Sequence, residues 1–114
     1  MRMTSLSKVM RKYGEEVQLK KRIEKKIDYQ TVYEYSDPVL VVGQFLQIMP
    51  YDLQYQLFGR AMVGDWIATF KPDVDISEGD LIILGADTLE VQNVILRKHG
   101  SKIMYKEVLL RKKQ

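Results

Sequence analysis

The sequence contains no cysteine and only one histidine, and these absences remove several kinds of site at once. Without thiols the chain can form neither a disulfide framework nor a thiolate metal centre, and such usage is typical of proteins made in a reducing cytoplasm. No stretch approaches the roughly 20 apolar residues of a membrane-spanning helix. The first residues, MRMTS, lack the apolar segment of a secretory signal. We therefore expect assembly in the cytoplasm and no membrane partner.

Residues suited to catalysis are equally scarce. His99 precedes Gly100 in an expected turn, so we expect neither a zinc site nor a Ser-His-acid triad there. The densest acidic group lacks the glycine and final glutamate spacing of an EF-hand loop, and consists of Asp73, Asp75, Glu78 and Asp80. We expect Asp73 and Asp75 to serve a turn and Asp80 to begin a strand. The sequence predicts a protein that is not an enzyme, with no catalytic residue, cofactor or metal ligand.

Positive charge is concentrated towards the two ends of the chain. Residues 8–26 carry eight basic side chains against three acidic ones, and residues 97–113 carry seven against one. Residues 27–96 hold two basic side chains against eleven acidic ones. This asymmetry is compatible with solvated strand faces, with attraction between unlike surfaces of neighbouring copies, or with non-specific contact to nucleic-acid phosphates.

The hydrophobic pattern predicts a mainly β protein: a small antiparallel β-barrel with a short N-terminal helix and one long interaction loop, forming a single domain over residues 1–114. Residues 1–14 are the helical arm, because Leu6, Val9, Met10 and Tyr13 share one helical stripe. Strands are expected near 15–24, 31–35, 39–48, 66–70, 81–84, 89–96 and 103–110, with a β-bulge near 92–93 and a turn at 98–101. Residues 39–48 are apolar on both faces, which indicates cover by a helix or another subunit.

Residues 49–63 form the expected long loop, since they show no strand alternation. Loops of this length are usually functional or disordered, and the aromatic and amide side chains favour an interaction loop. The expected contact residues are Tyr51, Asp52, Leu53, Gln54, Tyr55, Gln56, Leu57, Phe58 and Arg60. Subunit contacts are expected from Leu6, Val9 and Met10 of the arm, and from Arg111, Lys112 and Lys113 of a flexible basic tail at 111–114.

Several of these segments together resemble one family. They are an opening YGEEVQLKKR at 13–22, VVGQF at 41–45, GDWIATF at 64–70 leading to ISEGDLI at 76–82, LEVQNV at 89–94, and an ending KEVLLR at 106–111. In this respect the chain is similar to the head-closure proteins of tailed phages and prophages, also called stoppers or head–tail connectors. Family members usually carry an aromatic residue where Leu89 stands.

The resemblance implies a virion structural protein of the phage neck. Such a subunit forms a hexameric or dodecameric ring below the portal and its adaptor, closes the DNA-filled head and offers a surface to tail terminator or tail tube proteins. In some members a long loop projects into the channel and holds the packaged DNA, and residues 49–63 are the matching segment here. The implied location is the head–tail interface of the virion.

Three other readings stay open at this point. The protein is alternatively a tail terminator or completion protein on the other side of the neck. It is alternatively a small OB-like or SH3-like barrel that binds nucleic acid, which the basic ends favour and the lack of paired stacking aromatics opposes. A metal-dependent enzyme that uses the acids near Asp73 is the third reading, and a metal titration tests it.

Overall fold

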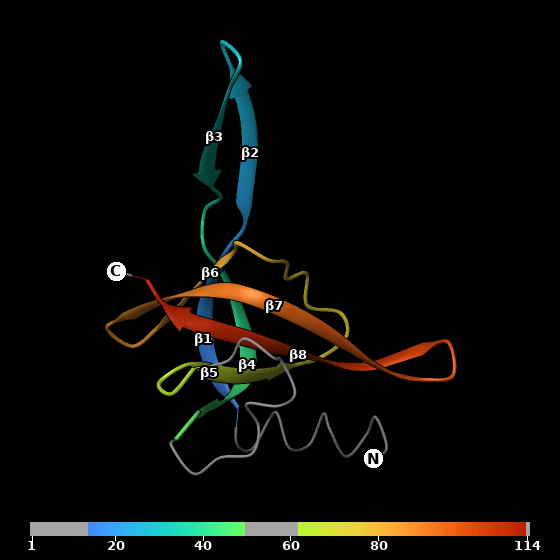
Figure 1. The fold of residues 1–114 in the computed structure, drawn as a ribbon. Helices are drawn as coiled ribbons and strands as arrows, with labels where there is room; N and C mark the ends of the chain where they lie inside the picture. Colours follow the sequence, from blue (N-terminus) through green and yellow to red (C-terminus); the bar gives the residue numbers. More distant parts are fainter. Residues whose placement is uncertain (1–13, 50–61, 114) are drawn as a thin grey trace.

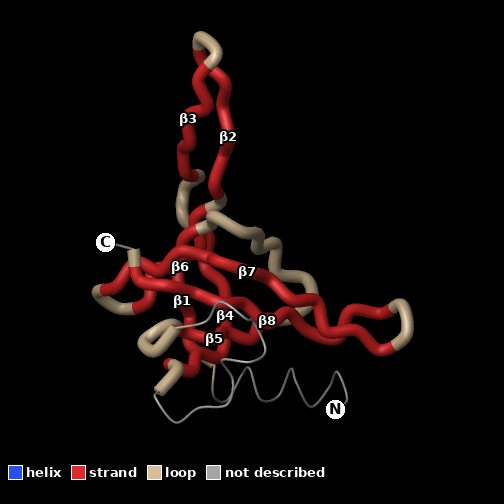
Figure 2. Tube along the Cα trace, viewed as in Figure 1, coloured by secondary structure: helices blue, strands red, loops and turns tan. Residues whose placement is uncertain are grey.

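The computed structural model describes residues 14–49 and 62–113, and these residues form strands joined by loops and turns (Figure 2). The strands are β1 (Glu15–Lys20), β2 (Arg22–Ile27), β3 (Gln30–Tyr35), β4 (Val39–Gln47), β5 (Trp66–Phe70), β6 (Leu81–Leu84), β7 (Asp87–His99) and β8 (Lys102–Lys112). The predicted helical arm, with Leu6, Val9 and Met10, lies outside the described residues, as do the loop residues 51–60.

Six of the strands close into a barrel in the order β1-β4-β5-β8-β7-β6, with β6 pairing back to β1. Each neighbouring pair in the barrel is antiparallel. The predicted antiparallel barrel is therefore confirmed. The remaining strands, β2 and β3, pair only with each other and rise away from the barrel as a two-stranded ribbon (Figure 1).

The barrel interior is filled mainly by alternate residues of its strands, and Ile76 is added from the segment between β5 and β6. One buried cluster consists of Val17, Leu19, Ala68, Phe70, Ile76, Ile82, Leu89, Val91, Val108 and Leu110. The Phe70 ring packs edge-on against Phe45, with ring centroids 5.8 Å apart. Gly43 makes room for that ring, because a Cβ at this position would lie 2.5 Å from the Phe70 Cε1 atom. Ile67 and Leu109 alternate with the interior residues and join Ile48 in a second buried cluster.

Two predicted local features are confirmed. β7 carries a register shift at residue 92, since Val91 pairs with Leu110 whereas Asn93 pairs with Leu109. This is the β-bulge that the change of apolar phase required. The turn between β7 and β8 consists of Gly100 and Ser101, with Gly100 at φ +64°.

Two predictions need correction, and one stays a prediction. The expected strand 15–24 is two strands, because the chain leaves the barrel at Lys21 and continues into the ribbon. The predicted cover of residues 39–48 by a helix or another subunit is not tested, because the helical arm lies outside the described residues; Leu40 and Leu46 are 62% and 52% exposed. The expected flexible tail is wrong for 111–113: β8 continues to Lys112, and the Lys113 N–H donates to the Thr88 carbonyl at 2.9 Å.

Candidate interaction surfaces

The ribbon of β2 and β3 is the most prominent feature outside the barrel (Figure 1). Its strands pair from Arg22↔Tyr35 to Ile27↔Gln30, and Asp28 and Tyr29 form the turn between them. Both turn residues have positive φ, 51° and 67°, as a tight hairpin turn of the primed type requires. Because the ribbon has two strands only, each strand keeps one edge free of any described partner.

The two faces of the ribbon differ in chemistry. Alternation places Ile23, Ile27 and Val32 on one face, and their exposed fractions are 42%, 52% and 38%. Lys25 and Glu34 lie on this face as an exposed ion pair at 2.8 Å. The ribbon therefore presents aliphatic side chains around one weak ion pair, which is the composition of a contact surface.

The opposite ribbon face carries aromatic and cationic groups. The Arg22 guanidinium stands 4.4 Å from the centroid of the Tyr33 ring. Near the base, the Lys113 ammonium lies 5.1 Å from the centroid of the Tyr35 ring and donates to its hydroxyl at 3.4 Å. Tyr35 thus joins the ribbon to the C-terminal end of β8.

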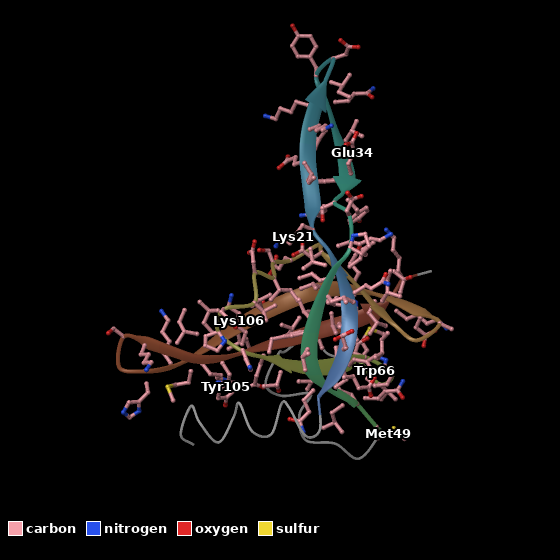
Figure 3. All side chains as sticks on the ribbon, turned by 180° about the vertical axis from the view of Figure 1, so that it is seen from behind. Lys21, Glu34, Met49, Trp66, Tyr105 and Lys106 are labelled. Carbon is pink, nitrogen blue, oxygen red and sulfur yellow. The ribbon has the colours of Figure 1, made fainter. Side chains whose placement is uncertain are left out.

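A buried carboxylate fixes the base of the ribbon to the barrel. Asp80, 1% exposed, precedes β6, and its Oδ1 accepts the Arg22 N–H at 2.8 Å. Its Oδ2 accepts the Ser77 N–H at 2.9 Å and the Lys21 ammonium at 2.6 Å. Figure 3 shows Lys21 at the junction between ribbon and barrel. The Asp80 side chain therefore joins the start of β2 to the turn before β6.

The return strand is secured at the same place. Lys21 donates its N–H to the Ser36 Oγ and accepts the Ser36 N–H at its carbonyl, each at 2.9 Å. Gly79 lies beside the Arg22 guanidinium, and a Cβ at Gly79 would overlap the Arg22 Cζ. Both strands of the ribbon are thus anchored where they leave the barrel, and the ribbon is held in one orientation by polar contacts.

A second buried carboxylate fixes the opposite end of the barrel. Asp65, 4% exposed, accepts two nearly parallel bonds from Arg111, from Nε at 3.1 Å and from Nη2 at 2.9 Å. It also accepts the Met62 N–H at 2.9 Å. The hydrogen bond with Asp65 raises the pKa of the Arg111 guanidinium, with burial opposing it and the charge of Asp65 adding to it. Arg111 is therefore a structural residue of the barrel.

The distal parts of β7 and β8 form a second projection, which extends sideways from the barrel (Figure 1). Its exposed positions include Lys98, His99 and Lys102. Arg97 forms an ion pair with Glu107 across the hairpin, and Lys106 donates to the Val74 carbonyl at 2.6 Å. The tip is therefore basic, while the cations closer to the barrel have partners within the chain.

The structure brings few of the predicted contact residues together. The nine loop residues lie outside the described part, but the loop ends meet: the Ile48 N–H donates to the Asp65 carbonyl at 2.7 Å, and the Gly64 N–H donates to the Ile48 carbonyl at 3.0 Å. Asp80 immediately precedes β6, which begins at Leu81, so it lies one residue before the predicted strand start. Of the predicted tail contacts, Arg111 binds Asp65 and Lys112 forms an ion pair with Asp87 at 3.3 Å.

Sequence reasoning did not find the ribbon as a projecting surface. The available signal was two six-residue β-type runs, 22–27 and 30–35, separated by two residues. Within residues 14–49 and 62–113 no group of histidine, aspartate or glutamate is arranged to hold a metal ion. No helix in these same ranges has the length and apolar character needed to cross a bilayer.

No family model matches the chain, and a search of curated proteins finds no match. The functional reasoning therefore stands on the residues and on the fold.

Proposed function

We propose that this protein is a structural subunit of the neck of a tailed-phage virion, where a ring of copies closes the DNA-filled head and offers a surface to the tail. Its partners would be further copies of itself, the portal or adaptor proteins, and tail terminator or tail tube proteins. Packaged DNA would pass through the ring without sequence-specific contact. The resemblance of segments such as GDWIATF at 64–70 to head-closure proteins supports this proposal.

The observation that carries the proposal is the anchored ribbon of β2 and β3. An isolated two-stranded hairpin is marginally stable in water, and this one exposes Ile23, Ile27 and Val32 to solvent on one face. A chain gains little stability by exposing such a face, but an assembly gains a contact. The Asp80 carboxylate presents the ribbon at a defined angle, which a repeating contact in a ring requires.

The test is to inactivate the gene in the phage or inducible prophage that carries it. We expect heads that package DNA, lack tails and lose their DNA on storage, because the neck is left open. Adding the purified protein to such heads should restore DNA retention and tail attachment. Electron microscopy of restored particles should then show a ring of this protein below the portal. Infectious particles that lack the protein would contradict the proposal.

The proposed gate is the loop over residues 49–63. Because Ile48 and Asp65 are joined by backbone hydrogen bonds, deletion of Leu53–Phe58 should leave the pairing of β4 with β5 intact. We expect a folded subunit that joins the neck but yields heads that leak DNA. Normal DNA retention by such heads would remove the gate from the proposal and leave the ring.

A nucleic-acid-binding barrel is the second candidate, and the basic tip of β7 and β8 favours it. Fluorescence anisotropy with short DNA across a salt series decides between the two. A nucleic-acid module should bind as a monomer, weaken steeply with salt, and lose affinity when Lys98 and Lys102 are both changed to glutamate. The control is Lys25→Glu with Lys26→Glu on the ribbon, which carries the same change of charge. Weak binding that responds equally to both double variants favours the neck subunit.

A further inference from the structure

The first half of β4 has a free edge within an otherwise closed barrel. Residues 39–43 pair with β1, whereas pairing with β5 starts only at Gly43↔Phe70 and continues to Gln47↔Trp66. After Phe70 the chain turns away, with the Val74 N–H donating to the Lys71 carbonyl at 3.2 Å. Residues Val39–Val42 therefore have β1 on one side and no paired strand of the described chain on the other.

An open groove of about 450 Å³ runs beside this edge. One wall is β4 itself, with Val39, Leu40 and Val42 exposed by 56%, 62% and 37%. The facing wall is the segment after β5, which contributes Lys71, Asp73, Val74 and Asp75. The groove is thus apolar along the strand edge. Its other side bears Asp73 and Asp75 together with Lys71, and Lys21, which also lines the groove, lies 3.4 Å from Asp75.

This edge is suited to receive another strand. In a β-strand the N–H and C=O groups of alternate residues point to alternate sides, so two residues of Val39–Val42 direct theirs into the groove. Exposed edges are usually protected by charged residues, proline or a bulge. Here four consecutive apolar residues, VLVV, stand at the edge instead. Such an edge pairs readily with an added strand.

The ribbon of the same molecule does not reach this groove. Its base is clamped by Asp80 and Ser36, and it rises from the barrel end (Figure 1). The ribbon of a second copy has the matching chemistry. The free edge of β2 carries Ile23 and Ile27 on one face with Lys25 between them, and these suit an apolar wall opposed by the exposed Asp73.

We infer that the β2 edge of one copy adds as a strand to Val39–Val42 of the next copy, with Ile23 and Ile27 against the apolar wall and Lys25 facing Asp73. The contact joins two different surfaces of the same chain, so it repeats head-to-tail and forms a ring when the rotation between copies closes. The inference rests on the proposed function, which requires a ring, and it names the surfaces that form it. The fixed orientation of the ribbon lowers the entropy lost on pairing.

Cysteine cross-linking tests this contact cleanly, because the chain has no cysteine of its own. Leu40→Cys protein is mixed with Lys26→Cys protein, since both side chains would lie on the outer face of the joined sheet. The control mixture replaces Lys26→Cys by Lys102→Cys, an equally basic exposed position on the other projection. With a short thiol-specific linker we expect heterodimer in the first mixture at about ten times the level of the control, since bound thiols meet at a high effective concentration.

Charge reversal gives a second, independent measurement. Lys25→Glu should weaken self-association by about two- to fivefold, the range for an exposed ion pair. Combination with Asp73→Lys should restore it, whereas Asp73→Lys with wild-type Lys25 should weaken it. Circular dichroism and the melting temperature of each variant verify that it folds. An apolar variant, Ile23→Asp with Ile27→Asp, should abolish association while the barrel still melts cooperatively.

The outcomes separate the inference from the proposed function. A ring that forms without preferential cross-linking of positions 40 and 26, or without rescue by the double charge reversal, overturns the inferred contact and leaves the neck function standing. The same holds if the concentrated protein stays monomeric and gives no cross-link. Preferential cross-linking in a protein that is absent from virions supports the contact and contradicts the neck function.

Discussion

Replacing Asp80 by asparagine tests whether one buried carboxylate joins the ribbon to the barrel. The amide keeps the shape of the side chain but has one acceptor oxygen, whereas the two carboxylate oxygens accept from Arg22 N, Ser77 N and Lys21 Nζ. Whichever way the amide is turned, at least one backbone N–H faces its NH₂ group. A buried donor without a partner costs about 1–3 kcal/mol.

The ion pair adds a smaller amount. The Lys21 side chain is 28% exposed, so its ammonium is partly rehydrated when Asp80 loses its charge, and the pair contributes about 1 kcal/mol or less. We expect a total loss of about 1–4 kcal/mol in the free energy of unfolding. At about 4 °C per kcal/mol for a domain of this size, the melting temperature should fall by about 4–16 °C. Urea unfolding and calorimetry measure both quantities.

The matched control is Asp75→Asn. Asp75 lies 3.4 Å from the same Lys21 ammonium, but its side chain is 88% exposed, so its loss should change stability by less than about 0.5 kcal/mol. Hydrogen exchange supplies a second readout, since the amides of β2 and β3 should lose protection in Asp80→Asn before those of the barrel. Equal stability of the two variants would refute the assignment of Asp80 as the anchor.

Three further predictions concern the barrel and the ribbon turn. Arg111→Lys removes the two parallel bonds to Asp65 and should cost about 1–2 kcal/mol in urea unfolding. Because the pKa of Arg111 is raised in the folded state, the stability that its charge contributes is fully present below the pKa of the unfolded state and is lost only as pH rises through the folded pKa. The loss in the free energy of unfolding on Arg111→Lys should therefore be equal at about pH 6 and about pH 9. Gly43→Ala places a Cβ against the Phe70 ring and should destabilise the barrel by about 1–3 kcal/mol; an unchanged melting temperature would contradict this packing. Tyr29→Gly relieves a non-glycine residue at φ 67° and should stabilise the ribbon by about 1 kcal/mol, seen as slower hydrogen exchange of its amides, whereas unchanged exchange would show that the turn is unstrained.

The barrel strands were predictable because their side chains alternate and strong turn residues separate them. The runs at 66–70 and 81–84 correspond to β5 and β6 as the structure has them. The bulge was predictable because Leu89 and Val91 fall in one phase and Val94 in the other, and the register shift lies between them. Such features depend on neighbours in sequence, which is why sequence reasoning reaches them.

The ribbon was missed for two physical reasons. Its first strand, RIEKKI, has polar residues at four of six positions, so it reads as a continuation of β1. Its turn, Asp28 and Tyr29, lacks the glycine that usually marks a primed turn. The anchor was also out of reach, because Lys21 and Asp80 are 59 residues apart and meet only once the barrel closes. Asp80 could be predicted to begin a strand, but its partners could not.

The structure also changes the meaning of the charge asymmetry. Several cations from the basic ends pair with acids of the middle within one chain: Lys21 with Asp80, Arg111 with Asp65, and Lys112 with Asp87. Charge that seemed available for attraction between copies is therefore partly used inside each copy. The exposed apolar surfaces at the β4 edge and on the ribbon then carry more of the assembly energy than the sequence suggested, and burial of apolar groups is not screened by salt. Self-association should accordingly weaken only a few-fold between low and physiological salt, whereas a steep loss would return the leading role to charge.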